Sequence, residues 1–598
     1  MTASARSLPF GAELVDGTNT RFRLWAPDAR SVSLLIEEGP SVPMEYASGG
    51  WFSTIATAPA GTLYRYLVDD KLHIPDPASR FNPQDVFGPS EVIDPKSYIW
   101  QDDGWQGRPW EEAVVCELHL GTFSEEGHCL GAIKHLDHLV ETGITAIEIM
   151  PVADFPGKRN WGYDGVLPYA PDHAYGRPED LKKLVDTAHQ KGLSVILDVV
   201  CNHFGPSGNF LSQYAKAFFS ERHRTPWGPA INFDGPMSET VRRFFIENAL
   251  YWLEEYHFDG LRLDAVHAIL DDSSPSFIEE LEERAGKRFA LQKRVHLILE
   301  NDANEARFLK PSADKPLPSL AQWNDDLHHA LHVILTGETD GYYADYAPEP
   351  EKHLGRCLAE GFAYQGEFSP YRGKKRGEKS GDLPLGAFVS FLQTHDQIGN
   401  RPRGERLQAL CDEKWLYAAM SLLLLCPHIP MLFMGEEFLA DTPFCYFCDH
   451  EQELMEKIRK GRQEEFQKFR SWGAEDTSSL PDPGGEDTFL SSRLRWKSLL
   501  EPRHQAFHAF VKALLRLRKE RIAPLIPQVI PGKSSFRPLG PGAVEALWPT
   551  PSGKLRLLAN LGKEALSFSW QGEPFFSFPK GGEKTNLLAP SVLWFLEG

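Results

Sequence analysis

The sequence is poor in cysteine, in long apolar runs and in positive charge. Its 598 residues include 8 cysteines in no framework spacing, and Cys116, Cys129 and Cys426 lie inside apolar runs. Such cysteines are typical of reduced, buried thiols in a cytosolic protein and argue against a disulfide scaffold. No run is long and apolar enough to cross a bilayer, and the longest, residues 416–426, predicts a buried helix. We therefore expect a cytoplasmic protein without a membrane partner.

The shortage of positive charge argues against a further class of protein. Lys and Arg number 63 against 83 Asp and Glu, which gives a formal net charge of −20. A chain this acidic is not expected to bind nucleic acid. A lone Cys-x-x-Cys, formed by Cys445 and Cys448, has no second pair in reach, so we predict neither metal nor redox use there.

Short strands occupy both ends of the chain. Near the N-terminus, apolar stretches separated by Gly, Pro and Asp predict a small β-sandwich, with strands at residues 21–25, 32–36, 51–55 and 63–68. After about residue 521 the short-strand pattern returns and predicts a small β domain. We expect three domains, which comprise residues 1–105, 106–520 and 521–598.

Between these ends, strands alternate with helices over some 400 residues, which predicts a parallel α/β fold. Eight strands are expected, at residues 113–118, 145–151, 193–200, 260–264, 296–299, 322–326, 387–393 and 429–434. Polar groups recur at the C-terminal ends of these strands. That recurrence favours a (β/α)₈ TIM barrel over a doubly wound sheet, which would gather its site at one switch point.

Three acids follow separate predicted strands. Residues 258–267 read Phe-Asp-Gly-Leu-Arg-Leu-Asp-Ala-Val-His, so Arg262 and Asp264 alternate with leucines. Charges in a buried run are costly unless they are paired or used, and this stretch alone equally fits a structural Arg–Asp pair capping a strand. Glu300 and Asp396 also follow apolar runs. At the ends of barrel strands, Asp264, Glu300 and Asp396 would face one pocket.

Such a set of acids suits the cleavage of a glycosidic bond. One carboxylate must be ionised to attack the anomeric carbon, and another must be protonated to deliver a proton to the leaving oxygen. When carboxyls lie close together, the pKa of one of them rises, so that this one stays protonated while the other is ionised. Two further segments place polar groups nearby: Asp198, Asn202 and His203 follow the third strand, and residues 160–165 read Asn-Trp-Gly-Tyr-Asp-Gly.

Taken together and in this order, four segments resemble the conserved regions of the α-amylase family of glycoside hydrolases: Asp198 to His203, Gly260 to Asp264, Glu300, and His395-Asp396. The resemblance implies that Asp264 is the nucleophile, that Glu300 is the general acid and then the base, and that Asp396 holds the distorted sugar ring. It implies a retaining mechanism with carboxyls roughly 5 Å apart. It assigns substrate binding to Tyr163, Asp164, His203, Arg262, His267, His395 and Arg401, and it implies that Arg262 keeps Asp264 ionised and oriented. It implies no cofactor, and since no oxygen-rich loop is evident, we predict no required metal.

A closer resemblance is to a branch of this family that releases trehalose from the ends of maltooligosaccharides. It rests on residues 22–27, 75–90, 117–123, 147–151, 322–329 and 395–401. The resemblance implies that the substrate is an α-glucan oligosaccharide ending in trehalose. It also implies a partner enzyme, maltooligosyltrehalose synthase, without a stable complex.

Two other functions stay open at this point. A glycogen branching enzyme would carry the same front module and the same acids, and residues 322–329 are the feature that argues against it. A catalytically silent glucan-binding protein on the same scaffold is the second, and the presence of all three acids argues against it because a binding module has no need of them.

Overall fold

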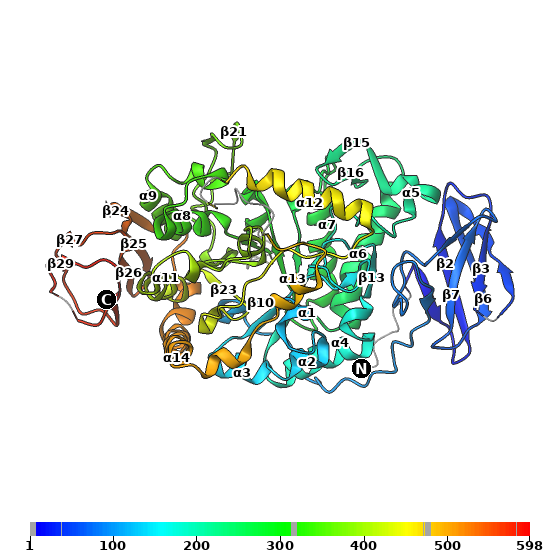
Figure 1. Ribbon diagram of the computed structural model, residues 1–598, viewed down its shortest axis with the longest axis horizontal. Helices are drawn as coiled ribbons and strands as arrows, with labels where there is room; N and C mark the ends of the chain where they lie inside the picture. Colours follow the sequence, from blue (N-terminus) through cyan, green and yellow to red (C-terminus); the bar gives the residue numbers. More distant parts are fainter. Residues whose placement is uncertain (1–7, 38, 312–319, 470–471, 473–479, 582) are drawn as a thin grey trace.

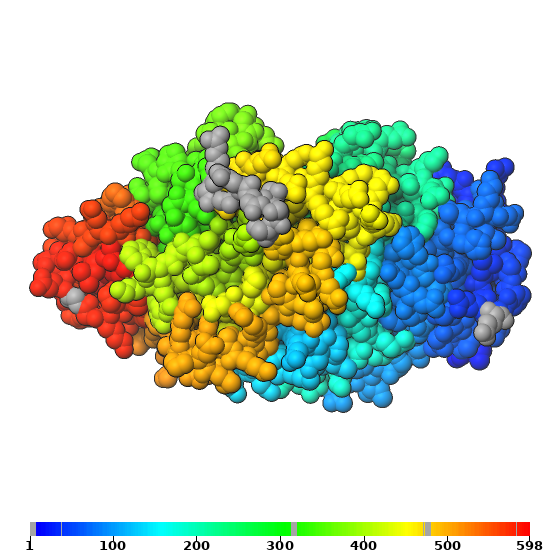
Figure 2. Space-filling model, viewed as in Figure 1, coloured from blue at the N-terminus to red at the C-terminus, as the bar shows by residue number. Residues whose placement is uncertain are grey.

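The three parts of the molecule follow one another along its longest axis (Figure 1). The computed structural model describes residues 8–37, 39–311, 320–469, 472, 480–581 and 583–598. The N-terminal strands lie at one end, the barrel fills the middle, and the C-terminal strands lie at the other end, so that the surface runs from blue to red along its length (Figure 2).

The N-terminal part is the predicted β-sandwich. Its two antiparallel sheets have the strand orders β1-β2-β6-β5 and β4-β3-β7-β8, with β9 beside β7. Phe22 and Leu24 of β2 face the core, while the arginines that alternate with them are partly exposed, and the Phe22 ring meets Tyr64 edge-on at 4.8 Å. The strands are β1 Gly11–Leu14, β2 Asn19–Trp25, β3 Val32–Ile36, β4 Ser41–Pro43, β5 Glu45–Ala47, β6 Trp51–Thr57, β7 Leu63–Val68, β8 Leu72–Ile74 and β9 Ser90–Glu91.

The central part is a closed barrel of eight parallel strands, as the sequence predicts. The strands are β10 Val115–Leu118, β11 Ala146–Ile149, β14 Ser194–Val199, β17 Gly260–Leu263, β18 His296–Leu299, β19 Leu320–Trp323, β22 Phe388–Ser390 and β23 Ile429–Phe433. Alternate side chains such as Val115, Ile196, Ile298 and Met431 fill the barrel interior as one apolar cluster. This packed layer supports the carboxyl ends of the strands, where the polar residues lie.

Helices pack around the barrel with their apolar faces inward. In α4, Pro178 occupies the first turn, where no backbone donor is needed, and Leu181, Leu184, Val185 and Ala188 are buried. The longer helices are α4 Pro178–Gln190, α6 Ser238–Glu255, α7 Phe277–Phe289, α8 Asp325–Thr336, α9 Pro350–Glu360, α11 Glu413–Leu425, α12 Gln452–Phe466 and α14 Pro502–Leu517. The predicted buried helix at residues 416–426 is α11, which is buried on nearly all sides.

Two short helices stand where the sequence favours one. The helical spacing of Leu130, Ile133, Leu136 and Val140 predicts a single helix that Gly143 ends, but the chain forms α2 Cys129–Ile133 and α3 Leu136–Thr142. His135, which lies between them, stacks on Trp496 with 3.9 Å between ring centroids. The break turns Leu130 and Val140 to the surface, 37% and 38% exposed. The spacing identified apolar residues correctly but not the face they occupy.

The C-terminal part is the predicted small β domain. Its main sheet has the order β24-β25-β26-β30-β28, and β27 pairs with β29. Trp548 stacks on Trp594 at 5.5 Å, and its Nε1 donates to the Leu358 carbonyl of α9 at 3.0 Å, which ties the sheet to the barrel. The strands are β24 Ser535–Gly540, β25 Ala543–Thr550, β26 Gly553–Asn560, β27 Leu566–Ser567, β28 Phe576–Phe578, β29 Asn586–Leu587 and β30 Ser591–Glu597.

None of the helices in the described part of the chain has the length and apolar character needed to cross a membrane.

Candidate active site

The carboxyl ends of the barrel strands open into one cleft of about 640 Å³. Of the ten residues that the sequence predicts for the site, eight line it: Tyr163, Asp164, His203, Asp264, His267, Glu300, His395 and Asp396. Arg262 and Arg401 do not. The three predicted acids therefore share one pocket, although they come from separate strands.

Arg262 lies beneath the cleft and is fully buried. Its Nη1 donates to Asp198 Oδ2 at 2.8 Å and to Asp264 Oδ1 at 2.7 Å, and its Nη2 is 3.8 Å from Glu300 Oε2. The guanidinium also covers the Trp323 ring at 4.1 Å. No part of Arg262 reaches the cleft, so a contact with substrate is not seen, whereas its bond to Asp264 fits the predicted role of keeping that carboxylate ionised and oriented. Arg262 serves as the shared counter-ion that makes burial of three carboxyls tolerable.

Asp264 is held in its ionised form. Burial pushes the pKa of its carboxyl up, but the charge of Arg262, the charge of His203 and a hydrogen bond from Asn202 more than offset this. Asn202 Nδ2 donates to Asp264 Oδ2 at 3.0 Å and to the Asp264 carbonyl at 2.8 Å. The pKa of Asp264 therefore lies below its ordinary value of 3.8. An ionised carboxylate is what a nucleophile at this position requires.

Glu300 shifts in the opposite direction. Burial raises the pKa of its carboxyl, the Asp264 charge raises it further, and Arg262 opposes them without prevailing, so the pKa lies above 4.5. Its Oε2 also accepts from the Ala265 backbone N–H at 2.5 Å. Two carboxyls whose pKa values are separated in this way can take different roles. The one with the lowered pKa, Asp264, suits a nucleophile, and the one with the raised pKa, Glu300, suits a general acid.

We expect kcat/KM to depend on pH as a bell. The acidic limb reports the first proton loss of the Asp264–Glu300 pair and should lie below pH 3.8. The alkaline limb reports the second proton loss of the same pair and should lie above pH 4.5. Activity thus falls at low pH because the nucleophile gains a proton, and at high pH because the acid loses one. A pH profile of kcat/KM measures both limbs, and an alkaline limb below pH 4.5 would contradict the assignment.

A loop between β12 (Ala153–Asp154) and β13 (Leu167–Pro171) carries Tyr163 and Asp164 into the cleft. Tyr163 donates its hydroxyl to Asp198 Oδ2 at 2.7 Å and stacks on the His395 ring at 5.1 Å. Gly162 has φ +104°, and a Cβ there would lie 2.1 Å from the Pro151 carbonyl oxygen. The glycine therefore lets the loop turn tightly enough to lay the Tyr163 ring over the strand ends.

The histidines of the cleft are fixed by neighbours. His395 Nδ1 pairs with Glu117 Oε1 at 2.5 Å. Burial lowers the pKa of His395, but the Glu117 and Asp396 charges outweigh it and raise that pKa to about 9. His203 Nε2 is 3.1 Å from the Tyr163 carbonyl oxygen, and its ring stacks on Trp227 at 5.0 Å. At neutral pH the site thus holds a cationic His395 next to its acids.

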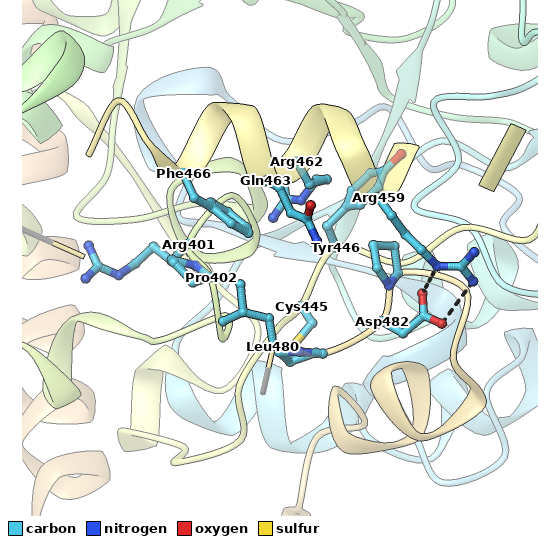
Figure 3. Close-up of a pocket in the computed structure, with 12 residues that line it drawn as sticks. Arg401, Pro402, Cys445, Tyr446, Arg459, Arg462, Gln463, Phe466, Leu480 and Asp482 are labelled. Atoms are coloured by element: carbon cyan, nitrogen blue, oxygen red, sulfur yellow. Dashed lines mark hydrogen bonds and ion pairs between the residues drawn. The ribbon is translucent and has the colours of Figure 1, made fainter. Parts of the chain in front are cut away.

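Arg401 lies apart from the cleft, contrary to its predicted contact with substrate. Its guanidinium binds Glu338 through Nη1 and Nη2, at 2.8 and 3.0 Å, and covers the Trp472 ring at 5.1 Å. It lines a separate cavity of about 250 Å³ beside α12, and its guanidinium points away from the other side chains of that cavity (Figure 3). A carboxylate far away in the sequence fixes its direction, which the local motif does not reveal.

The sequence interpretation missed two kinds of residue. Glu117 and Glu148 lie inside barrel strands and are almost fully buried. A charge within an apolar strand was a signal for both, as it was for Arg262. Residues of loops and turns also line the cleft, and the sequence carries no signal for them: Trp227, Asp302, Tyr371 and Arg372. Asp325, the first residue of α8, lines the cleft as well and lies in the segment 322–329 that the sequence singled out. Burial, and then the Glu300 and Asp302 charges, raise the pKa of Asp325 well above its ordinary value.

Potential metal ligands gather in two places among the described residues. Two sets bring three donor atoms close enough to share an ion: Asp154, Asp172 and His173, and His223, Asp234 and Asp272. Neither set contains a residue that was predicted for the site.

The barrel, the acids at its strand ends and the arginine beneath them define a glycoside hydrolase of the α-amylase type. Residues 96–227 match the family described as alpha amylase, catalytic domain, and residues 9–81 match carbohydrate-binding module 48 (isoamylase N-terminal domain). A malto-oligosyltrehalose trehalohydrolase from Saccharolobus solfataricus is 42% identical over 86% of this chain and 87% of its own. The chain belongs to the malto-oligosyltrehalose trehalohydrolase family.

Two further comparisons show how far the similarity to other α-glucan enzymes extends. A crystal structure titled putative alpha amylase, from Salmonella typhimurium, has 43% identity and a TM-score of 0.94, and the match covers 98% of this chain and 99% of that one. A 1,4-alpha-glucan branching enzyme from Pseudoalteromonas atlantica is 34% identical over 44% of this chain and 41% of its own. Similarity to the branching enzyme is thus partial, whereas similarity to the trehalohydrolases spans most of the chain.

Proposed function

We propose that this enzyme hydrolyses the α-1,4-glucosidic bond next to the terminal trehalose of a maltooligosyltrehalose. The products are trehalose and a maltooligosaccharide. The observation that carries the chemistry is the pair of acids on one buried arginine, with the pKa of Asp264 lowered and that of Glu300 raised. The proposed substrate is supported by the sequence similarity of this chain to malto-oligosyltrehalose trehalohydrolases, which extends over most of its length.

The reaction takes two steps. Asp264 attacks the anomeric carbon of the glucose that precedes the trehalose, while Glu300 gives its proton to the bridging oxygen, so that the C–O bond breaks and trehalose leaves. Glu300, now a carboxylate, then takes a proton from water as the water oxygen attacks the same carbon. The ester bond to Asp264 breaks, and both carboxyls return to their starting protonation states with the anomeric configuration retained.

The other cleft residues hold the sugar whose bond is cut. Asp396, which is 45% exposed at its side chain, accepts hydrogen bonds from hydroxyls of the distorted ring. The cationic His395 donates to a neighbouring hydroxyl, and His203 lies beside the sugar with its Nε2 held by the Tyr163 carbonyl. The Tyr163 ring stacks beneath the pyranose, in the orientation set by its bond to Asp198. Arg262 acts only through the carboxyls that it touches.

We expect free trehalose from a maltooligosaccharide that ends in trehalose, and little action on the plain maltooligosaccharide of equal length. Both substrates are incubated with the enzyme, and the products are separated by chromatography. Branched chains from the plain substrate would instead indicate a branching enzyme. No change in either substrate would indicate a silent glucan-binding protein.

We further propose that the substrate is supplied by a maltooligosyltrehalose synthase that acts separately, and that the enzyme works in the cytoplasm. All eight cysteines are free thiols and seven of them are buried, which suits a reducing compartment. For domain boundaries we propose residues 1–105, 106–520 and 521–598.

A further inference from the structure

Three metal-ligating side chains meet behind the loop that carries Tyr163. Asp154 is the last residue of β12, Asp172 follows β13, and His173 begins the next turn. His173 Nδ1 lies 3.9 Å from Asp154 Oδ1 and 3.6 Å from Asp172 Oδ1. One donor atom from each residue lies within 4.8 Å of the other two. That span fits three ligands placed around one ion, since metal–ligand bonds of 2.0–2.4 Å separate such ligands by at most about 4.8 Å.

Asp154 is the unexplained member of this cluster. Its side chain is 0% exposed, and among the described residues neither of its carboxyl oxygens has a hydrogen-bond partner. The one ion pair given for it in the described part of the chain is with His173. Asp172, by contrast, accepts from the Phe155 and Ala174 backbone N–H groups at 3.0 and 2.7 Å. A buried carboxylate without a partner is costly, so Asp154 requires a further group beside it.

We propose that Asp154, Asp172 and His173 bind a divalent cation of the Mn²⁺ or Zn²⁺ class. Two carboxylates and one imidazole nitrogen suit these ions better than Ca²⁺, which takes six to eight oxygen ligands. The ion satisfies the Asp154 oxygens and cancels the charge of the two carboxylates. His173, whose side chain is 20% exposed, gives the ion a route from solvent.

The competing occupant is a proton shared by the two carboxyls. Burial raises the pKa of Asp154 well above its ordinary value and the charge of Asp85 adds to this, while a hydrogen bond with the Asp172 carboxyl, when that carboxyl carries the proton, opposes both. Burial and the Asp154 charge likewise raise the pKa of Asp172 well above its ordinary value. One proton could therefore take the place of the cation. The Asp154→Asn variant distinguishes the two occupants. The amide is isosteric with the protonated acid, so it can replace a carboxyl that holds a proton, but it cannot supply the charged ligand that a cation needs.

The position of the cluster gives the ion a structural consequence. β12 and β13 pair in antiparallel fashion, and the Val166 backbone N–H donates to the Asp154 carbonyl at 2.9 Å. An ion held by Asp154 and Asp172 therefore ties both strands together at the root of the loop. Tyr163 and Asp164 lie within that loop and reach the cleft. Cation binding thus stabilises the segment that presents these two side chains.

The test is a calorimetric titration of the full-length protein, stripped of metal with EDTA, with MnCl₂ and separately with ZnCl₂. We expect one equivalent to bind and the Tm to rise at saturation. In Asp154→Asn the affinity should be at least about 100-fold weaker, and the rise in Tm should disappear. His173→Ala, at a partly exposed position, should also weaken binding and guards against misfolding of the first variant.

A matched control comes from the other cluster. Asp272 is 68% exposed and pairs with Arg222 at 2.6 Å, so Asp272→Asn should leave the titration unchanged. Loss of the measured binding in this variant would place the ion at the exposed cluster and overturn the proposal. So would wild-type protein that binds neither metal more tightly than millimolar, or Asp154→Asn that binds as the wild type does. Either of these last two results would leave the shared proton as the occupant.

Discussion

Asp264→Asn is expected to lower kcat by roughly 10⁴-fold or more, because the amide cannot form the covalent glycosyl-enzyme. The change should leave the fold intact. Arg262 keeps its bond of 2.8 Å to Asp198, so its buried charge stays paired, and the amide oxygen can still accept from either Arg262 or Asn202, although not from both. Trehalose release from the trehalose-ended substrate measures kcat, and thermal unfolding should give a Tm within about 2 °C of the wild type.

The control for this variant is Asp272→Asn, which changes the same side chain at an exposed position outside the cleft and should have wild-type kcat. A near-wild-type rate for Asp264→Asn would remove the nucleophile assignment. A lost rate together with a collapsed Tm would instead show that the carboxylate is needed for folding.

Glu300→Gln is expected to lower trehalose release by roughly 10²–10⁴-fold, because the amide has no proton to give to the leaving oxygen. The same change removes the alkaline limb of the pH profile, since that limb reports the second proton loss of the Asp264–Glu300 pair. The Ala265 N–H can still donate to the amide oxygen, so the side chain keeps its place. The measurement is kcat/KM for trehalose release across the pH range.

A substrate whose leaving group needs no proton separates the two steps. With a maltooligosyl fluoride, the Glu300→Gln variant should release fluoride in a burst of one equivalent and then slowly, because the base for the second step is also missing. Mass spectrometry should find the sugar on a peptide that contains Asp264. Fluoride release as slow as trehalose release, with no labelled peptide, would exclude Glu300 as the general acid.

Much of the fold could be predicted because its signals are local. Each barrel strand is a short apolar run bounded by turn residues, and even the strand near Gln322 fell within a few residues of β19. Asp264 and Glu300 were predicted for the same reason, since each follows such a run directly, whereas Asp396 lies beyond β22 in the short helix α10 (His395–Gly399). Asp264 and Glu300 therefore lie at strand ends because they are the residues that come next in the sequence after those strands.

What the sequence could not predict depends on partners far away in the chain. Arg401 belongs to a motif of the cleft, yet Glu338 draws its guanidinium elsewhere. The bond of Arg262 to Asp264 was predicted, but its second bond, to Asp198, which helps to hold it below the cleft, was not. Trp227 reaches the cleft from the turn of a hairpin, between β15 (Phe219–Thr225) and β16 (Gly228–Ile231). Directions of side chains and contacts between loops follow from packing, which no local pattern encodes.

The closure of the barrel has a consequence for how the enzyme is made. The pairing of β10 with β23 sets Val115 opposite Met431, and so joins the first and last strands of the barrel. Beside this seam, Glu117 of β10 holds His395, which follows β22. Pairings so distant in sequence form late, because the entropy of closing the intervening chain is lost first. Hydrolytic activity should therefore be the last property that a refolding chain regains, and the first that it loses when the seam opens.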